Sequence, residues 1–245
     1  MLRYALTLEY DGTRFSGWQS QEGLRTVQGK LENALGVLLR KPVKVMGASR
    51  TDKGVHALGQ VAIFDTEHPV PTHRLIRSLS ALLRPDIAVV DAREVAADFQ
   101  PRFSATGKHY RYRVLNRSAP SPLLARTSWH VFSALDDDAM RDAADLLQGT
   151  HDFAAFRAAD CHRDNTVRTL TAIHLTRVRD DLLEMHVYGD SFLKYMVRII
   201  AGTLVEIGTG RRSLDDVRRA LQTPKRHWAG RTAPPHGLTL MEIFF

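Results

Sequence analysis

The stretch FLKYMVRIIAGTLVEI, residues 192–207, has the most apolar periodic pattern in the 245-residue chain. One stripe of apolar side chains recurs every three or four residues, and Val197 and Val205 help to fill the opposite face. A helix that is apolar nearly all round is buried, so this stretch predicts a central helix with other elements packed around it. Arg198 interrupts the pattern, and a buried guanidinium needs an anion beside it, because leaving it unpaired is strongly destabilising.

The remaining sequence surrounds this helix with shorter elements of both kinds. Alternating apolar and polar residues predict strands, whereas apolar residues at helical spacing predict helices. The expected strands are 2–10, 43–46, 61–64, 87–95, 109–115, 170–178, 182–187 and 237–245. The other expected helices are 27–39, 72–83, 137–147 and a short last helix that opens with the capping pattern SLDD, residues 213–216.

The order of strands and helices is similar in the two halves of the chain. The stretch 99–108, which carries Pro101 and Gly107, is the best internal boundary. We therefore expect an α+β fold of two similar lobes, 1–105 and 106–245. Neighbouring strands joined by short turns favour mostly antiparallel sheets with flanking helices over a doubly wound parallel sheet. A substrate is expected in a cleft between the lobes.

Composition narrows the function classes. The 34 Lys and Arg against 27 Asp and Glu leave a net charge of +7, which favours a polyanionic partner. The single cysteine, Cys161, excludes an internal disulfide and any cysteine-built zinc or iron–sulfur site. The first residues lack the apolar core of a signal peptide, and no apolar run reaches the ~20 residues that span a bilayer. We therefore expect a cytosolic protein with no membrane partner.

The densest polar cluster is GASRTDKGVHA, residues 47–57, between two expected strands. Arg50, Asp52 and Lys53 place one acid between two bases, and the glycines suit a tight loop of fixed shape. An acid with cationic neighbours stays ionised, which suits a nucleophile or an electrostatic stabiliser better than a general acid. A hairpin turn with a surface ion pair explains the same residues. Motifs of nucleotide hydrolases, zincins and zinc deaminases are missing.

Seven blocks together resemble the tRNA pseudouridine synthase A family. They are SRTDKGVHA at 49–57, YDGT at 10–13, GWQ at 17–19, TVQ at 26–28, HDFAAFR at 151–157, FLKYMVRI at 192–199 and APPHGL at 233–238. The blocks cover nearly the whole chain in the right order. The resemblance implies an isomerase, a homodimer, that converts uridine to pseudouridine at positions 38, 39 and 40 in the anticodon stem-loop of tRNA.

The resemblance also implies the residues of the site. Asp52 is the catalytic nucleophile, Tyr110 binds the base, Arg50 supports the flipped nucleotide or its phosphate, and Arg198 pairs with Asp52. The reaction breaks the bond between uracil and ribose, turns the base and rejoins it through carbon, so it needs no metal or other cofactor. A carboxylate either attacks the sugar carbon, or stabilises its positive charge and takes a ribose proton. Both routes stay open.

Each of these residues also has a plain structural interpretation. Tyr110 lies on the apolar face of an alternating strand with Tyr112 and Val114, opposite His109, Arg111 and Arg113, so without the resemblance it is a core residue. Arg50 pairs with a neighbouring acid in the alternative interpretation. For Arg198 the structural partners are Glu206 or Asp190.

A basic segment follows the central helix and is expected to contact RNA phosphates. Phosphate contacts position RNA without reading its sequence, and Trp228 either stacks on a base or packs internally. The basic residues are Arg211, Arg212, Arg218, Arg219, Lys225, Arg226 and Arg231. Two other functions remain: a noncatalytic RNA-binding module, and a carboxylate-dependent hydrolase, which usually needs a second acid beside the first.

Overall fold

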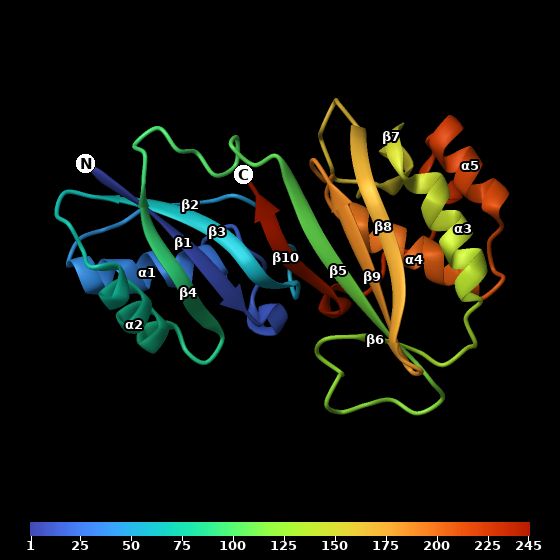
Figure 1. Ribbon diagram of the computed structural model, residues 1–245, viewed down its shortest axis with the longest axis horizontal. Helices are drawn as coiled ribbons and strands as arrows, with labels where there is room; N and C mark the ends of the chain where they lie inside the picture. The colour runs from blue at the N-terminus through green and yellow to red at the C-terminus, as the bar shows by residue number, and fades with distance from the viewer. The chain divides into compact units, whose positions relative to one another are not determined.

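The computed structural model describes residues 1–245 and divides into two compact units (Figure 1). The first unit comprises Met1–Thr106 and Thr239–Phe245, and the second comprises Gly107–Leu238. The expected lobes, 1–105 and 106–245, differ from these units in the final strand, which belongs to the first unit. The reason is that β10 (Leu238–Phe244) pairs in parallel with β3 (His56–Thr66), a pairing between distant segments that no local pattern announces.

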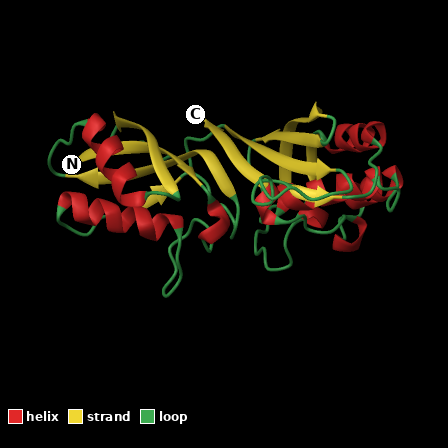
Figure 2. Cartoon of the chain, turned by 90° about the horizontal axis from the view of Figure 1, so that it is seen from below, coloured by secondary structure: helices red, strands yellow, loops and turns green.

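The first unit is a sheet with two helices on it. β1 (Leu2–Tyr10) lies between β3 and β4 (Ile87–Val95) and is antiparallel to both, while the short β2 (Val45–Gly47) is antiparallel to β3. Helices α1 (Val27–Leu39) and α2 (Thr72–Leu83) contact each other and lie against the strands (Figure 2). Their fully buried leucines are Leu31, Leu35, Leu75 and Leu79. Both helices occupy the expected ranges.

The second unit also has a mostly antiparallel sheet. Its order is β5 (Gly107–Asn116), β9 (Leu182–Gly189), β8 (Val167–Arg179) and β7 (Gly149–Asp152), with β6 (Trp129–Val131) parallel to β5. The short strands β6 and β7 were not expected, because each is defined by its pairing with β5 or β8, which the local sequence does not show.

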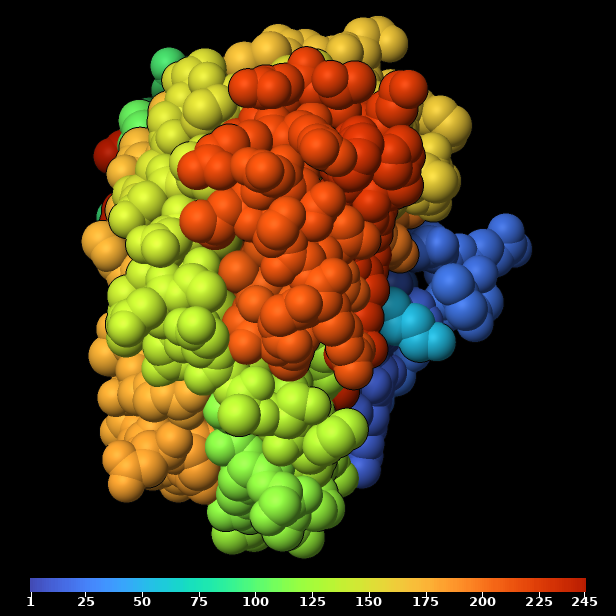
Figure 3. Space-filling model, turned by 90° about the vertical axis from the view of Figure 1, so that its right-hand side faces the viewer, coloured from blue at the N-terminus to red at the C-terminus, as the bar shows by residue number.

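Three helices complete the second unit: α3 (Asp137–Leu147), α4 (Met196–Gly208) and α5 (Leu214–Gln222). Helix α3 contacts α4 and α5, and Figure 3 shows α3 in yellow-green beside α5 in orange-red on one face of this unit. The capping box expected at the start of α5 is confirmed, since Ser213 and Asp216 bond reciprocally to each other's backbone N–H. Short 3-10 turns occupy Gly12–Arg14, Ala154–Phe156, Arg226–Trp228 and Pro235–Gly237.

Helix α4 is the buried central helix that its pattern predicts. All of its 13 residues except Arg198 and Glu206 are buried. The helix begins at Met196, later than expected. Tyr195 adopts a left-handed backbone conformation with φ 64°, so a right-handed helix cannot extend through it toward Phe192. Phe192 and Tyr195 therefore precede the helix.

The α+β class and the mostly antiparallel pairing are confirmed, although β3 pairs with β10 and β5 pairs with β6 in parallel. No helix is long and apolar enough to cross a membrane.

Candidate functional site

The acid loop, residues 48–55, connects β2 to β3 in the first unit and presents Asp52 at a tight turn. The Asp52 carbonyl accepts a hydrogen bond from the Val55 N–H at 3.1 Å. Gly54 is the third residue of this four-residue turn and has φ 80°, a positive value that glycine adopts without steric cost. Asp52 is half-buried at this turn, while Arg50 and Lys53 are exposed. The loop therefore has a defined backbone and an acid that is partly withdrawn from solvent.

Buried side chains hold the part of the acid loop that leads to Asp52. The Gln60 side chain, which is fully buried, donates to the Ser49 carbonyl at 2.7 Å and accepts from the Ser49 N–H at 3.2 Å. The Tyr10 hydroxyl is 2.7 Å from Oγ1 of Thr51. Two sheet strands, β3 and β1, thus anchor the residues on the amino-terminal side of the acid. Gln60 was not singled out from the sequence. The only feature that could have indicated it is an amide next to the apolar residues of the expected strand 61–64.

The backbone of residues 15–18 packs against the acid loop. The Trp18 N–H donates to the Thr51 carbonyl at 3.0 Å, and the Gly54 N–H donates to the Phe15 carbonyl at 3.3 Å. Gly17 has φ 93°, and a Cβ on it would lie 2.8 Å from the Thr51 carbonyl oxygen and 3.3 Å from the Asp52 carbonyl carbon. Only glycine lets these two backbones approach so closely.

We expect Gly17→Ala to lower the rate of any reaction in which the Asp52 carboxylate takes part by about 100-fold, because a misplacement of about 1 Å has an effect of that size. The methyl group pushes on the Asp52 backbone itself rather than on a flexible side chain. The matched control is Gly23→Ala, since Gly23 also has positive φ, 73°, but a Cβ there meets nothing within 4 Å. Both variants should lose about 1 to 2 kcal/mol of stability from backbone strain alone. Single-turnover rates and thermal unfolding separate the two effects, and equal rates in both variants would contradict the prediction.

In the second unit, Tyr110 lies on the inner face of β5. Its side chain is buried, and its ring meets the Phe192 ring edge to face, with centroids 5.1 Å apart. Tyr112 follows on the same face and donates its hydroxyl to the Pro234 carbonyl at 2.8 Å. Burial raises the pKa of Tyr112 far above its usual value, so this hydroxyl stays protonated. The expected apolar face, Tyr110, Tyr112 and Val114, is confirmed.

Arg198 lies half-buried in the first turn of α4, where two groups hold its guanidinium. Its Nε donates to the Ala233 carbonyl at 2.8 Å, and its Cζ lies 4.6 Å from the centre of the Tyr195 ring. The two structural partners considered for Arg198 bind other donors. Glu206 is about 12 Å further along the helix axis by its eight-residue separation, and its carboxylate accepts from Arg212 at 2.6 Å. Asp190 accepts from the Ser191 backbone N–H.

The opposite face of the β5 and β9 sheet carries a chain of polar contacts. Nε2 of His109 is 2.9 Å from Nδ1 of His186, and Nε2 of His186 is 3.1 Å from Glu184. Arg113 donates to Glu184 at 2.7 Å. Burial and the charges of His186 and Arg111 lower the pKa of His109 to about 4.

Glu184 stays ionised within this chain of contacts. Burial by itself would raise its pKa, but the Arg113 hydrogen bond, the Arg111 charge and the His186 contact together hold that pKa below its usual value. The basic face expected on this strand is therefore a partly neutralised network rather than a row of unpaired cations.

The basic residues after α4 divide into those that bind other groups of the protein and those that only face solvent. Arg212 donates to Glu206 and to the Trp228 carbonyl, and Arg226 donates to the carbonyls of Ala229 and Gly230. These two arginines therefore hold the backbone together. Three others also have protein contacts: Arg218 pairs with Asp215, Arg219 lies over the Trp228 ring, and Arg231 lies over the Trp129 ring. Arg211 and Lys225 are exposed.

The four expected site residues fall in two pairs. Arg50 and Asp52 belong to one loop of the first unit, and Tyr110 and Arg198 belong to the second unit. No group of three or more His, Cys, Asp or Glu side chains is arranged to hold a metal ion, and Cys161 is buried.

A family profile and three full-length relatives, all described as tRNA pseudouridine synthases, match this chain. The profile of a family described as tRNA pseudouridine synthase matches residues 7–104 and 143–245. A tRNA pseudouridine synthase A of Myxococcus xanthus is 51% identical over 245 residues, which is 100% of this chain and 92% of the relative. The enzyme of the same name from Acetivibrio thermocellus is 44% identical over 100% of both chains. That from Geobacter sulfurreducens is 46% identical over 98% of both.

Proposed function

The chain belongs to the tRNA pseudouridine synthase family, and from this premise we propose that it converts uridine to pseudouridine at positions 38, 39 and 40 of the tRNA anticodon stem-loop. Members of this family are isomerases that modify tRNA, so the reaction class and the substrate class follow from membership. The resemblance of the sequence blocks to this family is confirmed. The positions in tRNA and the roles of single residues belong to the proposal.

Asp52 is the catalytic nucleophile in this proposal. The observation that carries it is the construction of the acid loop: a half-buried carboxylate at a tight turn, held by buried Gln60 and Tyr10 and backed by Gly17. A preorganised carboxylate is what glycosidic bond cleavage requires. A hairpin turn with only a surface ion pair does not need buried side chains to hold its backbone.

The chemistry balances with no other reactant. The bond between C1′ of ribose and N1 of uracil breaks, and a bond between C1′ and C5 forms. In one route an Asp52 oxygen bonds to C1′ and is expelled when C5 attacks. In the other, Asp52 stabilises the positive charge on the sugar and takes a ribose proton, which it later returns. In both, the proton on C5 is lost and N1 gains a proton, so the product is an isomer of the substrate.

Three residues assist in the proposal. Tyr110 stacks on the uracil ring, Arg50 supports the flipped nucleotide or its phosphate, and Arg198 orients the Asp52 carboxylate with its planar fork. The exposure of Arg50 fits contact with a phosphate. The uridine must leave its stack to be reached, which costs a few kcal/mol. We also propose, from the resemblance, that the enzyme is a cytoplasmic homodimer.

The direct test is incubation with an unmodified tRNA transcript that carries uridine at positions 38 to 40, followed by chemical mapping of pseudouridine. The expected result is pseudouridine at these positions and nowhere else. A transcript with cytidine at all three positions is the matched control and should stay unchanged. Release of free uracil would favour a hydrolase, and tight binding without any changed base would favour a noncatalytic RNA-binding module.

The net charge of +7 leads to a prediction about salt. We expect the logarithm of tRNA affinity to fall by about 0.7 to 0.9 for each phosphate contact per tenfold rise in salt concentration. Alanine at the exposed Arg211 or Lys225 should reduce this slope by roughly one contact, because their cations have no internal task in the structure. Alanine at Arg212 should instead lower stability, because the Glu206 carboxylate loses the cation that binds it. Affinities at several salt concentrations check this, and a flat dependence would contradict it.

A further inference from the structure

We propose that Thr203, Glu206 and Arg212 form a clasp that positions the guanidinium of Arg198 through the loop 229–233. The proposal rests on the function proposed for Arg198. In this proposal none of the three clasp residues contacts the substrate. They act as positioning residues, and the loop carries their effect along α4 from Glu206 and Thr203 to Arg198 in its first turn.

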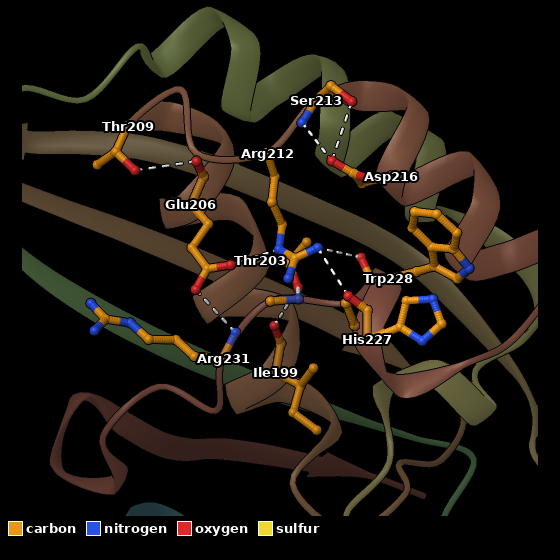
Figure 4. A network of polar contacts seen from close by, with 12 residues as sticks. Ile199, Thr203, Glu206, Thr209, Arg212, Ser213, Asp216, His227, Trp228 and Arg231 are labelled. Carbon is orange, nitrogen blue, oxygen red and sulfur yellow. Dashed lines mark hydrogen bonds and ion pairs between the residues drawn. The ribbon is translucent and has the colours of Figure 1, made fainter.

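The clasp binds the loop backbone directly (Figure 4). The Gly230 N–H donates to Oγ1 of Thr203 at 2.8 Å, and the Thr203 hydroxyl donates to the Ile199 carbonyl one turn earlier at 2.8 Å. The next N–H, that of Arg231, donates to Oε1 of Glu206 at 3.2 Å. Two side chains one turn apart on α4 therefore hold two successive N–H groups of the loop.

Arg212 completes the clasp from the other side of Glu206. Its Nε donates to Oε2 of Glu206 at 2.6 Å, and its second nitrogen donates to the carbonyls of Trp228 at 3.0 Å and His227 at 3.2 Å. Both carboxylate oxygens of Glu206 are thus occupied, one by the loop and one by Arg212 (Figure 4). A carboxylate with all its partners in place holds its geometry well, because each bond restricts the others.

The loop also lies unusually close to the helix. A Cβ on Gly202 would fall 1.9 Å from the Arg231 carbonyl oxygen, and one on Gly230 would fall 2.6 Å from Cα of Thr203. Backbone therefore packs on backbone, with a glycine on each side of the contact. At this distance the loop has little freedom to shift without breaking the bonds to Thr203 and Glu206.

The loop reaches Arg198 two residues after Arg231. The Ala233 carbonyl accepts from Nε of Arg198 at 2.8 Å, and the Ala233 N–H donates to the Arg198 carbonyl at 3.0 Å. The Tyr195 ring lies against the same guanidinium. A guanidinium is planar, so a bond at Nε and a ring against its face together set the direction of its two terminal nitrogens. A displaced Ala233 would therefore turn the fork that the reaction uses.

The first experiment compares two variants at Thr203, which is fully buried. Thr203→Val keeps the shape but removes the acceptor for the Gly230 N–H, and Thr203→Ser keeps the hydroxyl. We expect the valine variant to lose about 10- to 100-fold in single-turnover rate with tRNA affinity nearly unchanged, since about 1 Å of misplacement has such an effect. The serine variant should stay within about 3-fold of the native rate. Thr209→Val, one residue after the end of the same helix, is the matched control and should keep the native rate.

The second experiment separates positioning from plain structural support. The same Thr203→Val change is made in an Arg198→Gln enzyme, and the two rate losses are compared in a double-mutant cycle. If the clasp acts through Arg198, the valine change lowers the rate further by less than about 2-fold, because the group it positions is already gone. Losses that multiply would overturn the proposal, as would a native rate in Thr203→Val.

Two safeguards keep the outcomes distinct. If Thr203→Val does not fold, Glu206→Gln takes its place in both experiments, because it keeps an acceptor for the Arg231 N–H but loses the charge that holds Arg212. A native rate in Arg198→Gln would remove Arg198 from the proposed function itself. If Arg198→Gln is slow and the rate losses of the two changes multiply, the function proposed for Arg198 is kept and only the clasp proposal is overturned.

Discussion

Asp52→Asn should bind tRNA with near-native affinity and form pseudouridine at least about 10⁴-fold more slowly, the scale seen when a catalytic carboxylate is removed. The amide has nearly the shape of the carboxylate, so the turn from Asp52 to Val55 is kept and only the charge is lost. An amide neither attacks C1′ nor stabilises a cation there, so both routes of the proposed reaction fail. Single-turnover conversion and equilibrium binding of one tRNA measure the two properties.

The matched control is Asp91→Asn in β4 of the same unit, where the side chain is exposed. This variant should keep the native rate and affinity, which shows that a lost aspartate charge alone has no effect. Full activity in Asp52→Asn would remove Asp52 from the chemistry. A parallel loss of affinity would instead assign Asp52 to RNA binding.

Arg198→Lys should reduce the rate by about 100-fold although it keeps the charge. Lysine has no Nε–H to donate to the Ala233 carbonyl, which accepts from Arg198 at 2.8 Å. It also lacks the planar fork that binds a carboxylate through two parallel bonds. The loss should appear in the single-turnover rate more than in affinity, because the fork is proposed to orient Asp52 rather than to hold tRNA.

The control for this variant is Arg177→Lys. Arg177 also uses its fork, donating to both oxygens of Asp137 at 2.5 and 2.8 Å, but the pair joins β8 to α3 and has no proposed part in the reaction. The control should lower the melting temperature and leave the rate unchanged. A rate for Arg198→Lys close to that of the control would contradict the role of Arg198.

Local patterns predicted the helices well because each carries its signal within its own residues. The ranges 27–39, 72–83 and 137–147 agree with α1, α2 and α3 at both ends. The start of α4 was wrong, because Tyr195 takes a left-handed conformation that its sequence does not announce. Strand ends were less accurate: β3 begins at His56, five residues before the expected start at 61. Its first residues pair with β10, far away in the sequence.

The candidate site shows the same contrast. Asp52 and Arg50 stand in a block of nine residues, so a motif is enough to find them. A motif does not show which groups hold these residues in place, even where the supporting residue lies in another block, as Ala233 does. Gln60 holds Ser49 from the neighbouring strand, and Ala233 binds Arg198 across 35 residues. Neither is part of a local pattern with the residue that it supports.

The sequence by itself determined the family, the helices and the candidate acid, because each of them carries its signal within a short stretch of consecutive residues. The tertiary structure decided which groups hold those residues in place. It assigned Arg212 and Arg226 to internal carboxylate and carbonyl partners, although their charge suggested RNA phosphates. It also placed the last strand beside the first lobe. The strand pairing joins segments far apart in the chain, whereas the arginine bonds join groups three to sixteen residues apart that come within reach only when the backbone has folded.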